Sequence, residues 1–142
     1  MTYTPTEQAN IDAIYRFMEA EAVQDWDTVY QFIAPDCVNY SPTGVVRGHE
    51  EMHRFDAAMF AGLQSWRRTI LDIVADGDAV VFRWRGPGTH SAEWAGLSAS
   101  ANRVEFHGTS TVETKHGLAR RIWIDMDMAS VMRQMAPQET NQ

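Results

Sequence analysis

The spacing of apolar residues changes once along this chain, and that change limits the fold more than any other feature. Up to about residue 63, apolar side chains recur every three or four residues, which is the period of a helix. From Trp66 onward they alternate with polar side chains, which is the period of a strand. Helices followed by a run of antiparallel strands are typical of an α+β domain.

Three helices are expected in the first half of the chain. Thr4–Glu7 has the form of a capping box, so a first helix is predicted to run to about Val23. A short second helix is predicted from Trp26 and ends before Pro35. The third helix starts at Gly48, and its apolar face carries Met52, Phe55, Met59 and Leu63.

Strands are expected after these helices and between the last two of them. The predicted ranges are 37–41, 66–75, 79–85, 89–94, 103–114 and 118–126. Gly86-Pro87-Gly88 is expected to break the chain before the strand at 89–94, and Asp127 to cap a last short helix. A curved sheet, antiparallel or mixed, covered by the three helices would form a cone-shaped barrel. Its open mouth is where a small-molecule pocket is expected.

Composition limits the class of protein. With 142 residues the chain has the size of one domain, expected over 1–142 with an ordered core of about 5–136. The net charge is −7 and no run of Lys or Arg exceeds two, which argues against nucleic acid or an anionic membrane as partner. No apolar run approaches the ~20 residues of a membrane span, and the N-terminus resembles no leader segment, so a cytoplasmic protein is expected. The lone Cys37 excludes an intramolecular disulfide.

The alternation in the last two strands assigns their side chains to two faces. The set expected to face the cavity is Val104, Phe106, Gly108, Ser110 and Val112, with Leu118, Ile122, Ile124 and Met126 from the partner strand. The other face carries Trp123 and several threonines. That face is a candidate surface for a homodimer.

Several short segments occur in an order and spacing that resembles the SnoaL-like polyketide cyclases. They are Phe32–Asp36, Gly48–Glu50, Gly88–His90, Val104–Phe106, and Trp123 with Asp127, Arg133 and Gln134. That family belongs to a superfamily of cone-shaped folds that also includes ketosteroid isomerase and limonene epoxide hydrolase. The resemblance extends from Ile11 to Gln134 and implies the same α+β cone.

The resemblance also implies a chemistry, namely acid/base catalysis without a cofactor in an apolar pocket. The aldol-type cyclases remove a proton next to a carbonyl, and the carbanion closes a ring. By position, their catalytic His falls on Ser110 and their catalytic Asp on Ile124, and neither residue is a strong base. Any catalysis therefore needs a relocated acid/base or works by shaping the substrate. Asn39 matches an Asn of the family's pocket, and His90 matches the His of its Gly-x-His turn.

His90 is the first candidate for proton transfer, because imidazole titrates near neutrality and the residue is expected at the cavity mouth. Asp125 is the second, provided that a bulge turns it inward beside Ile124. Asn39 or Tyr40 would donate a hydrogen bond to a substrate oxygen. The remaining residues expected to contact a hydrophobic or polycyclic substrate are Tyr15, Trp26, Tyr30, Phe55, Met59, Trp66, Phe106, Ser110 and Ile124.

The leading hypothesis is a cofactor-free enzyme that binds a polyketide-like or other carbonyl-bearing molecule and catalyses cyclisation, isomerisation or elimination. One alternative is the opening of an epoxide, with Asp125 activating water. Another is a non-catalytic binding or accessory protein that has lost the His/Asp pair. His49–His53 formally matches the zinc motif H-E-x-x-H, but no third ligand is evident, and no metal is expected.

Overall fold

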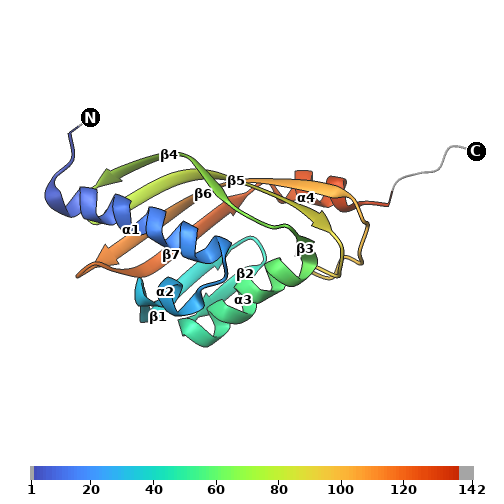
Figure 1. Cartoon of the computed structure of the whole chain (residues 1–142), viewed down its shortest axis with the longest axis horizontal. Helices are drawn as coiled ribbons and strands as arrows, with labels where there is room; N and C mark the ends of the chain where they lie inside the picture. Colours follow the sequence, from blue (N-terminus) through green and yellow to red (C-terminus); the bar gives the residue numbers. More distant parts are fainter. Residues whose placement is uncertain (1, 138–142) are drawn as a thin grey trace, which may run out of the picture.

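A curled mixed sheet covered by helices on one side forms the architecture of the computed structural model, which describes residues 2–137 (Figure 1). The α+β prediction is confirmed. The ends of the predicted 1–142 domain, Met1 and 138–142, lie outside the described residues. Within the described range, no helix has the length and apolar content needed to cross a membrane.

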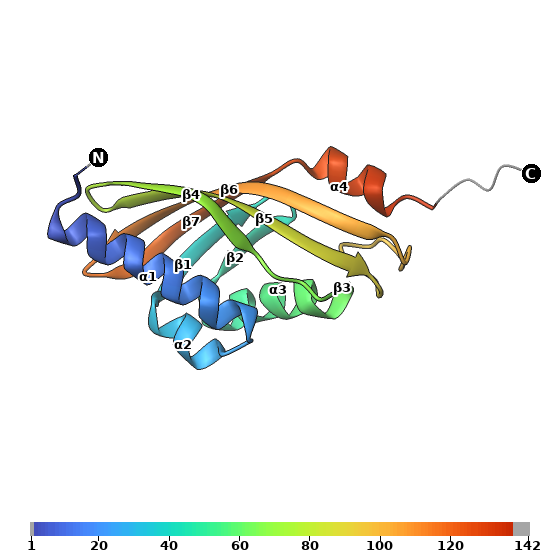
Figure 2. The same ribbon diagram turned by 45° about the horizontal axis from the view of Figure 1, so that its top comes forward.

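The three expected N-terminal helices are present on the inner side of the sheet (Figure 2). They are α1 (Pro5–Ala22), α2 (Trp26–Gln31) and α3 (Gly48–Gly62). The capping box is formed, because Thr4 accepts from the backbone N–H of Glu7 while the Glu7 carboxylate accepts from that of Thr4. Helix α1 packs against β4 and α3 against β1, so the buried faces of both helices are turned toward the strands.

The sheet has seven strands. They are β1 (Ile33–Ser41), β2 (Gly44–Arg47), β3 (Leu63–Gln64), β4 (Thr69–Asp76), β5 (Ala79–His90), β6 (Arg103–Lys115) and β7 (Leu118–Met126). Their order is β2-β1-β7-β6-β5-β3, with β4 also paired to β5. Only the β1–β7 pair is parallel among these described pairings. A last helix, α4 (Met128–Met135), is capped by Asp127 as expected and packs against β6.

The predicted break at Gly86-Pro87-Gly88 is wrong, and so is the separate strand at 89–94. β5 runs through these residues without interruption and pairs with β6 from Ala79 to Thr89. These glycines do not form a turn; they allow other side chains to pack closely against the strand. A Cβ on Gly86 would lie 2.4 Å from the Trp66 ring, so the indole occupies the space that a side chain would need.

The expected alternation is confirmed for β6 and for the part of β7 paired with it in regular register, since Phe106, Ser110, Val112 and Ile122 are buried. At the start of β7 it is wrong: the register shifts between Glu113 and Thr114, and Ala119 is fully buried there in place of Leu118. The outer face carries charged pairs, among them Arg83 with Asp72 and Arg121 with Glu113. Tyr40 and Trp123 stack there with their ring centroids 5.5 Å apart. A homodimer through this face stays a prediction.

Candidate functional site

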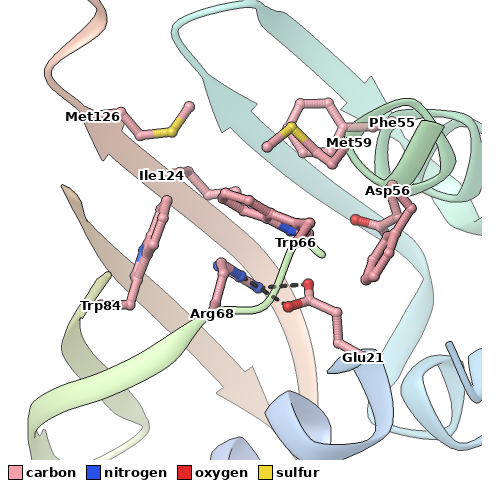
Figure 3. Close-up of a pocket in the computed structure, with 10 residues that line it drawn as sticks. Glu21, Phe55, Asp56, Met59, Trp66, Arg68, Trp84, Ile124 and Met126 are labelled. Carbon is pink, nitrogen blue, oxygen red and sulfur yellow. Dashed lines mark hydrogen bonds and ion pairs between the residues drawn. The ribbon is translucent and has the colours of Figure 1, made fainter. Parts of the chain in front are cut away.

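Two small chambers lie between the sheet and the helices, and both are lined by Asp56, Arg68 and Ile124. The first is completed by Glu21, Phe55, Met59, Phe60, Trp66, Trp84 and Met126 (Figure 3). The second is completed by Ile14, Phe17, Val29, Tyr30, Phe32, Ile33, Asn39, Met52, Phe82, Ser110, Val112 and Ile122. Their cavity volumes are about 30 and 40 Å³. A buried water molecule needs a cavity of about 10–15 Å³, so each chamber has room for a few water molecules.

Asp56 places a carboxyl group where the two chambers meet. The residue lies on α3, and its Oδ2 accepts a hydrogen bond of 2.8 Å from the hydroxyl of Tyr30 on α2. Burial and the negative charge of Glu21 raise the pKa of Asp56 to about 7, although the Tyr30 bond and the Arg68 charge oppose this shift. A carboxyl with this pKa can both accept and release a proton at neutral pH.

Glu21 and Arg68 form a buried ion pair beside Asp56. Arg68 Nε and Nη2 lie 2.9 and 2.7 Å from the two carboxylate oxygens of Glu21, and less than a tenth of either side chain is exposed. The guanidinium also lies over the Trp84 ring, 5.0 Å from its centroid. Because each charge of the pair is satisfied by the other, the pair fixes this part of the chamber wall. Asp56 is not part of the pair and is the carboxyl that can gain or lose a proton.

The second chamber contains two neutral polar groups on the strands. Ser110 accepts a 3.0 Å hydrogen bond from the Trp84 indole N–H. Asn39 is 6% exposed, and its Oδ1 has no hydrogen-bond partner among the described residues. A buried amide oxygen without a partner is unfavourable, so a ligand or water that bonds to Asn39 would gain binding energy there.

The structure brings seven of the sequence-predicted site residues to the chambers. They are Tyr30, Asn39, Phe55, Met59, Trp66, Ser110 and Ile124. Ser110 and Ile124 lie directly opposite each other on β6 and β7.

Four other predicted contact residues lie away from both chambers. Tyr40 packs on Trp123 at the outer face, and Tyr15 on α1 is 44% exposed. Trp26 packs in the α2–α3 contact against Tyr30 and Phe60. Phe106 is fully buried between Trp66 and Trp94.

His90 lies at the end of β5, outside the residues that line the chambers. Its side chain is fully buried, and both ring nitrogens are engaged: Nδ1 lies 2.9 Å from Ser100 Oγ, and Nε2 lies 3.2 Å from the Leu97 carbonyl oxygen. We therefore assign His90 the structural task of fixing the loop at 91–102, and its catalytic role finds no support in this geometry.

Asp125 is exposed on the outer face of β7. The register between β6 and β7 is regular around it, with Thr109 opposite Asp125 and Ser110 opposite Ile124, so the bulge that would turn it inward is absent at that point. Its carboxylate points away from the chambers.

The H-E-x-x-H histidines do not form a metal site. His49 Nε2 lies 2.7 Å from the Ile33 carbonyl oxygen, and His53 packs edge-on against Trp26. No group of three His, Cys, Asp or Glu side chains within residues 2–137 is arranged to hold an ion.

Three charged residues of the site were missed by sequence reasoning, and two of them left a readable signal. Asp56 lies four residues after Met52 and three before Met59, on the apolar face of its helix. Glu21 likewise lies three residues after Met18 on the buried face of α1. Burial of a carboxylate on the apolar face of a helix costs folding free energy, so a carboxylate at such a position is a candidate for a functional residue. Arg68 lies in an irregular segment and gave no such signal.

The model of the SnoaL-like polyketide cyclase family matches residues 12–135 of this chain. The chain belongs to this family. Among solved structures, a protein from Jannaschia sp. CCS1 assigned to the SnoaL-like polyketide cyclases is 21% identical, with a TM-score of 0.89, covering 97% of this chain and 99% of that one. No curated protein sequence matches the chain.

Two further structures similar to this SnoaL-like protein carry different assignments. IdmH from Streptomyces antibioticus, assigned as a polyketide cyclase, is 26% identical with a TM-score of 0.78, covering 89% of this chain and 97% of that one. An LEH-like epoxide hydrolase from M. tuberculosis is 21% identical with a TM-score of 0.73, covering 92% of each chain. The fold is thus shared by proteins of more than one activity, and the reaction has to be argued from the site.

Proposed function

We propose that this SnoaL-like protein is a cofactor-independent enzyme that transfers a proton next to the carbonyl group of an apolar, polyketide-like molecule. The observation that carries the proposal is the carboxyl of Asp56, which lines both chambers in largely apolar surroundings and is poised between its two protonation states near pH 7. Loss of a proton from carbon leaves a carbanion delocalised onto the carbonyl oxygen, and cyclisation, isomerisation or elimination follows from that species.

Asn39 supports the proposal from the opposite wall. Its amide has an unsatisfied oxygen in the second chamber, and the same side chain carries an N–H₂ group that can donate to a carbonyl oxygen. A fixed donor at the oxygen where negative charge develops stabilises the enolate. In this scheme Asp56 is the base and Asn39 binds the oxygen.

Ligand binding requires the first chamber to widen. Its present volume accepts a few waters, whereas a two-ring ketone is several times larger. Met59 and Met126 line the chamber, and methionine side chains repack at low energetic cost. Substitution of Met126 by Ala is therefore expected to tighten binding of flat ketones.

The test uses deuterium exchange at the carbon next to the carbonyl of 1-tetralone, followed by NMR in D₂O. The wild type is expected to accelerate exchange, with a rate that rises with the ionised fraction of Asp56 around pH 7. Asp56→Asn should reduce the enzymatic rate by about 100-fold or more, the typical contribution of a general base. The matched control is Asp27→Asn, an exposed carboxylate on α2. Full activity of Asp56→Asn would refute the proposal.

Epoxide opening is a second candidate, because each chamber has room for water beside the Asp56 carboxyl. In that reaction the carboxylate would activate water for attack on the ring. Incubation with indene oxide in H₂¹⁸O distinguishes the two: a labelled diol that disappears in Asp56→Asn supports hydrolysis. Tight binding of tetralone without exchange, and no diol, would instead support the non-catalytic binding protein.

A further inference from the structure

The ionisable groups of the two chambers come from the helices and from Arg68. Glu21 belongs to α1, Tyr30 to α2 and Asp56 to α3, while Arg68 lies in the segment that leads into β4. The described lining residues from the strands carry no ionisable group: Ile33 and Asn39 from β1, Phe82 and Trp84 from β5, Ser110 and Val112 from β6, and Ile122, Ile124 and Met126 from β7. The strand residues therefore form a neutral wall, and the titratable groups belong to the helices and to Arg68, whose guanidinium lies over the Trp84 ring and is paired with Glu21.

Figure 3 shows the residues of the two walls. Ile124 and Met126 extend from β7 on one side of the view, Asp56 and Phe55 extend from α3 on the other, and the Trp66 ring is drawn between them. A flat ligand between them would turn one face to the sheet and the other to α3. The ring of Trp84 contributes a flat surface to the sheet side. It is held by its bond to Ser110 and by Gly108, where a Cβ would come within 2.4 Å of the indole.

Of the charged groups around the ligand, Asp56 alone among the described lining residues is free to exchange a proton near neutrality. Glu21 is bound through both oxygens to Arg68. Tyr30 donates a hydrogen bond to Asp56 Oδ2, and burial together with the neighbouring Asp56 raises the pKa of its phenol, so the phenol keeps its proton. Asp56 Oδ1 is not engaged by Tyr30, so it is the atom available to the ligand.

We propose that the site removes and returns the proton on a single face of a flat ketone, the face turned toward α3. The proposal rests on the proposed function and adds its stereochemical course. The C–H bond on that face breaks, its proton moves to Asp56 Oδ1, and the electron pair stays on the ligand as an enolate. The same carboxyl then returns a proton to the same carbon, and the C–H bond re-forms on the same face.

The neutral wall enforces this course. Ile124, Met126 and Trp84 cover the sheet-side face of the ligand, and none of them carries an exchangeable proton that can be transferred to carbon. Exchange with solvent therefore passes through Asp56, and the configuration at carbon is retained.

The test uses racemic 2-methyl-1-tetralone in D₂O, with the deuterium content of each enantiomer measured by chiral chromatography and mass spectrometry. The wild type is expected to label one enantiomer at least about tenfold faster than the other, and to label it faster than it racemises. A tenfold ratio corresponds to about 1.4 kcal/mol between the two transition states. Equal labelling of both enantiomers, or racemisation as fast as labelling, would overturn the one-face proposal and leave the proposed function standing.

A pair of double variants tests the role of the two walls. Asp56→Asn with Ile124→Asp moves the carboxylate from α3 to β7, and it should label the opposite enantiomer. Asp56→Asn with Ile124→Asn is the matched control without a carboxylate, and it should label neither. If the Ile124→Asp variant fails to fold, the wild-type enantiomer ratio still decides the question. Absence of any labelling by the wild type would instead count against the proposed function itself.

Discussion

The hydroxyl of Tyr30 on α2 donates a hydrogen bond of 2.8 Å to Asp56 Oδ2 on α3. This contact joins two helices across the wall of the cavity and orients the one carboxyl that lines both chambers without an ion-pair partner among the described residues. It favours the ionised form of Asp56, whereas burial favours the neutral form. The balance between the two sets the pH at which Asp56 can act as a base.

Removal of the Tyr30 hydroxyl should shift that balance. In Tyr30→Phe the carboxylate loses a donor, so the pKa of Asp56 rises and a smaller fraction is ionised at pH 7. Deuterium exchange into 1-tetralone should fall several-fold at pH 7 and recover at higher pH. Tyr3→Phe, outside the chambers, serves as the control. A pH profile whose midpoint stays in place or moves down would contradict this account of Tyr30.

Asp56 should also make stability depend on pH in a defined direction. Its pKa is about 7 in the folded protein and about 4 in the unfolded chain, so the folded state binds more protons between these values. Stability of the wild type therefore falls as pH rises through that window. Asp56→Asn lacks this loss and should be more stable than the wild type by about 1–4 kcal/mol at pH 8, with the gain vanishing near pH 4. Urea unfolding of both proteins at pH 8 and near pH 4 measures the difference in their free energies of unfolding. The same difference at both pH values would contradict a raised pKa of Asp56.

The buried pair of Glu21 and Arg68 should be sensitive to the loss of one partner. Glu21→Gln removes the carboxylate that binds the buried guanidinium through both oxygens, and a cost of about 3–5 kcal/mol in the free energy of unfolding is expected. The double variant Glu21→Gln with Arg68→Met removes both charges and should recover most of that loss. If the single variant costs less than about 1 kcal/mol, the pair is not buried as described.

His90 should prove structural. His90→Ala leaves a cavity in the core and removes the acceptor of the Ser100 backbone N–H, so we expect a loss of about 2–4 kcal/mol in stability. Exchange activity per folded molecule should remain, in contrast to Asp56→Asn. The control is His116→Ala in the exposed turn between β6 and β7. Activity lost with an intact fold would restore the catalytic role that the sequence suggested for His90.

Periodicity predicted the elements well because burial on one face leaves a regular mark on the sequence. The helices at Pro5–Ala22 and Gly48–Gly62, and the long hairpin of β6 and β7, appear where the apolar spacing placed them. The uninterrupted β5 was missed because Gly86 reads as a breaker. A glycine is needed at position 86 because the Trp66 ring occupies the space of a side chain there. A contact between residues 20 positions apart leaves no local pattern in the sequence.

The candidate site was only partly readable for a similar reason. Strand alternation predicted that Ile124 faces the cavity, and the match to the family's pocket predicted the same for Asn39. The pairing of Glu21 with Arg68 joins residues 47 positions apart, and no spacing rule predicts it. Asp56 could have been found, because its carboxylate interrupts an apolar helix face. The resemblance directed attention to β7 and β5, whereas the carboxyl that enters the cavity lies on α3.

The most direct test of the account is the titration of Asp56 itself. In protein labelled with ¹³C at the aspartate carboxyl carbons, the Asp56 signal is assigned by its absence from Asp56→Asn and followed by NMR from pH 3 to 9. If Asp56 is the proton carrier of the site, its midpoint lies near pH 7. A midpoint near pH 4, the value of a carboxyl in water, would mean that Asp56 is not poised as a base and would contradict the central claim.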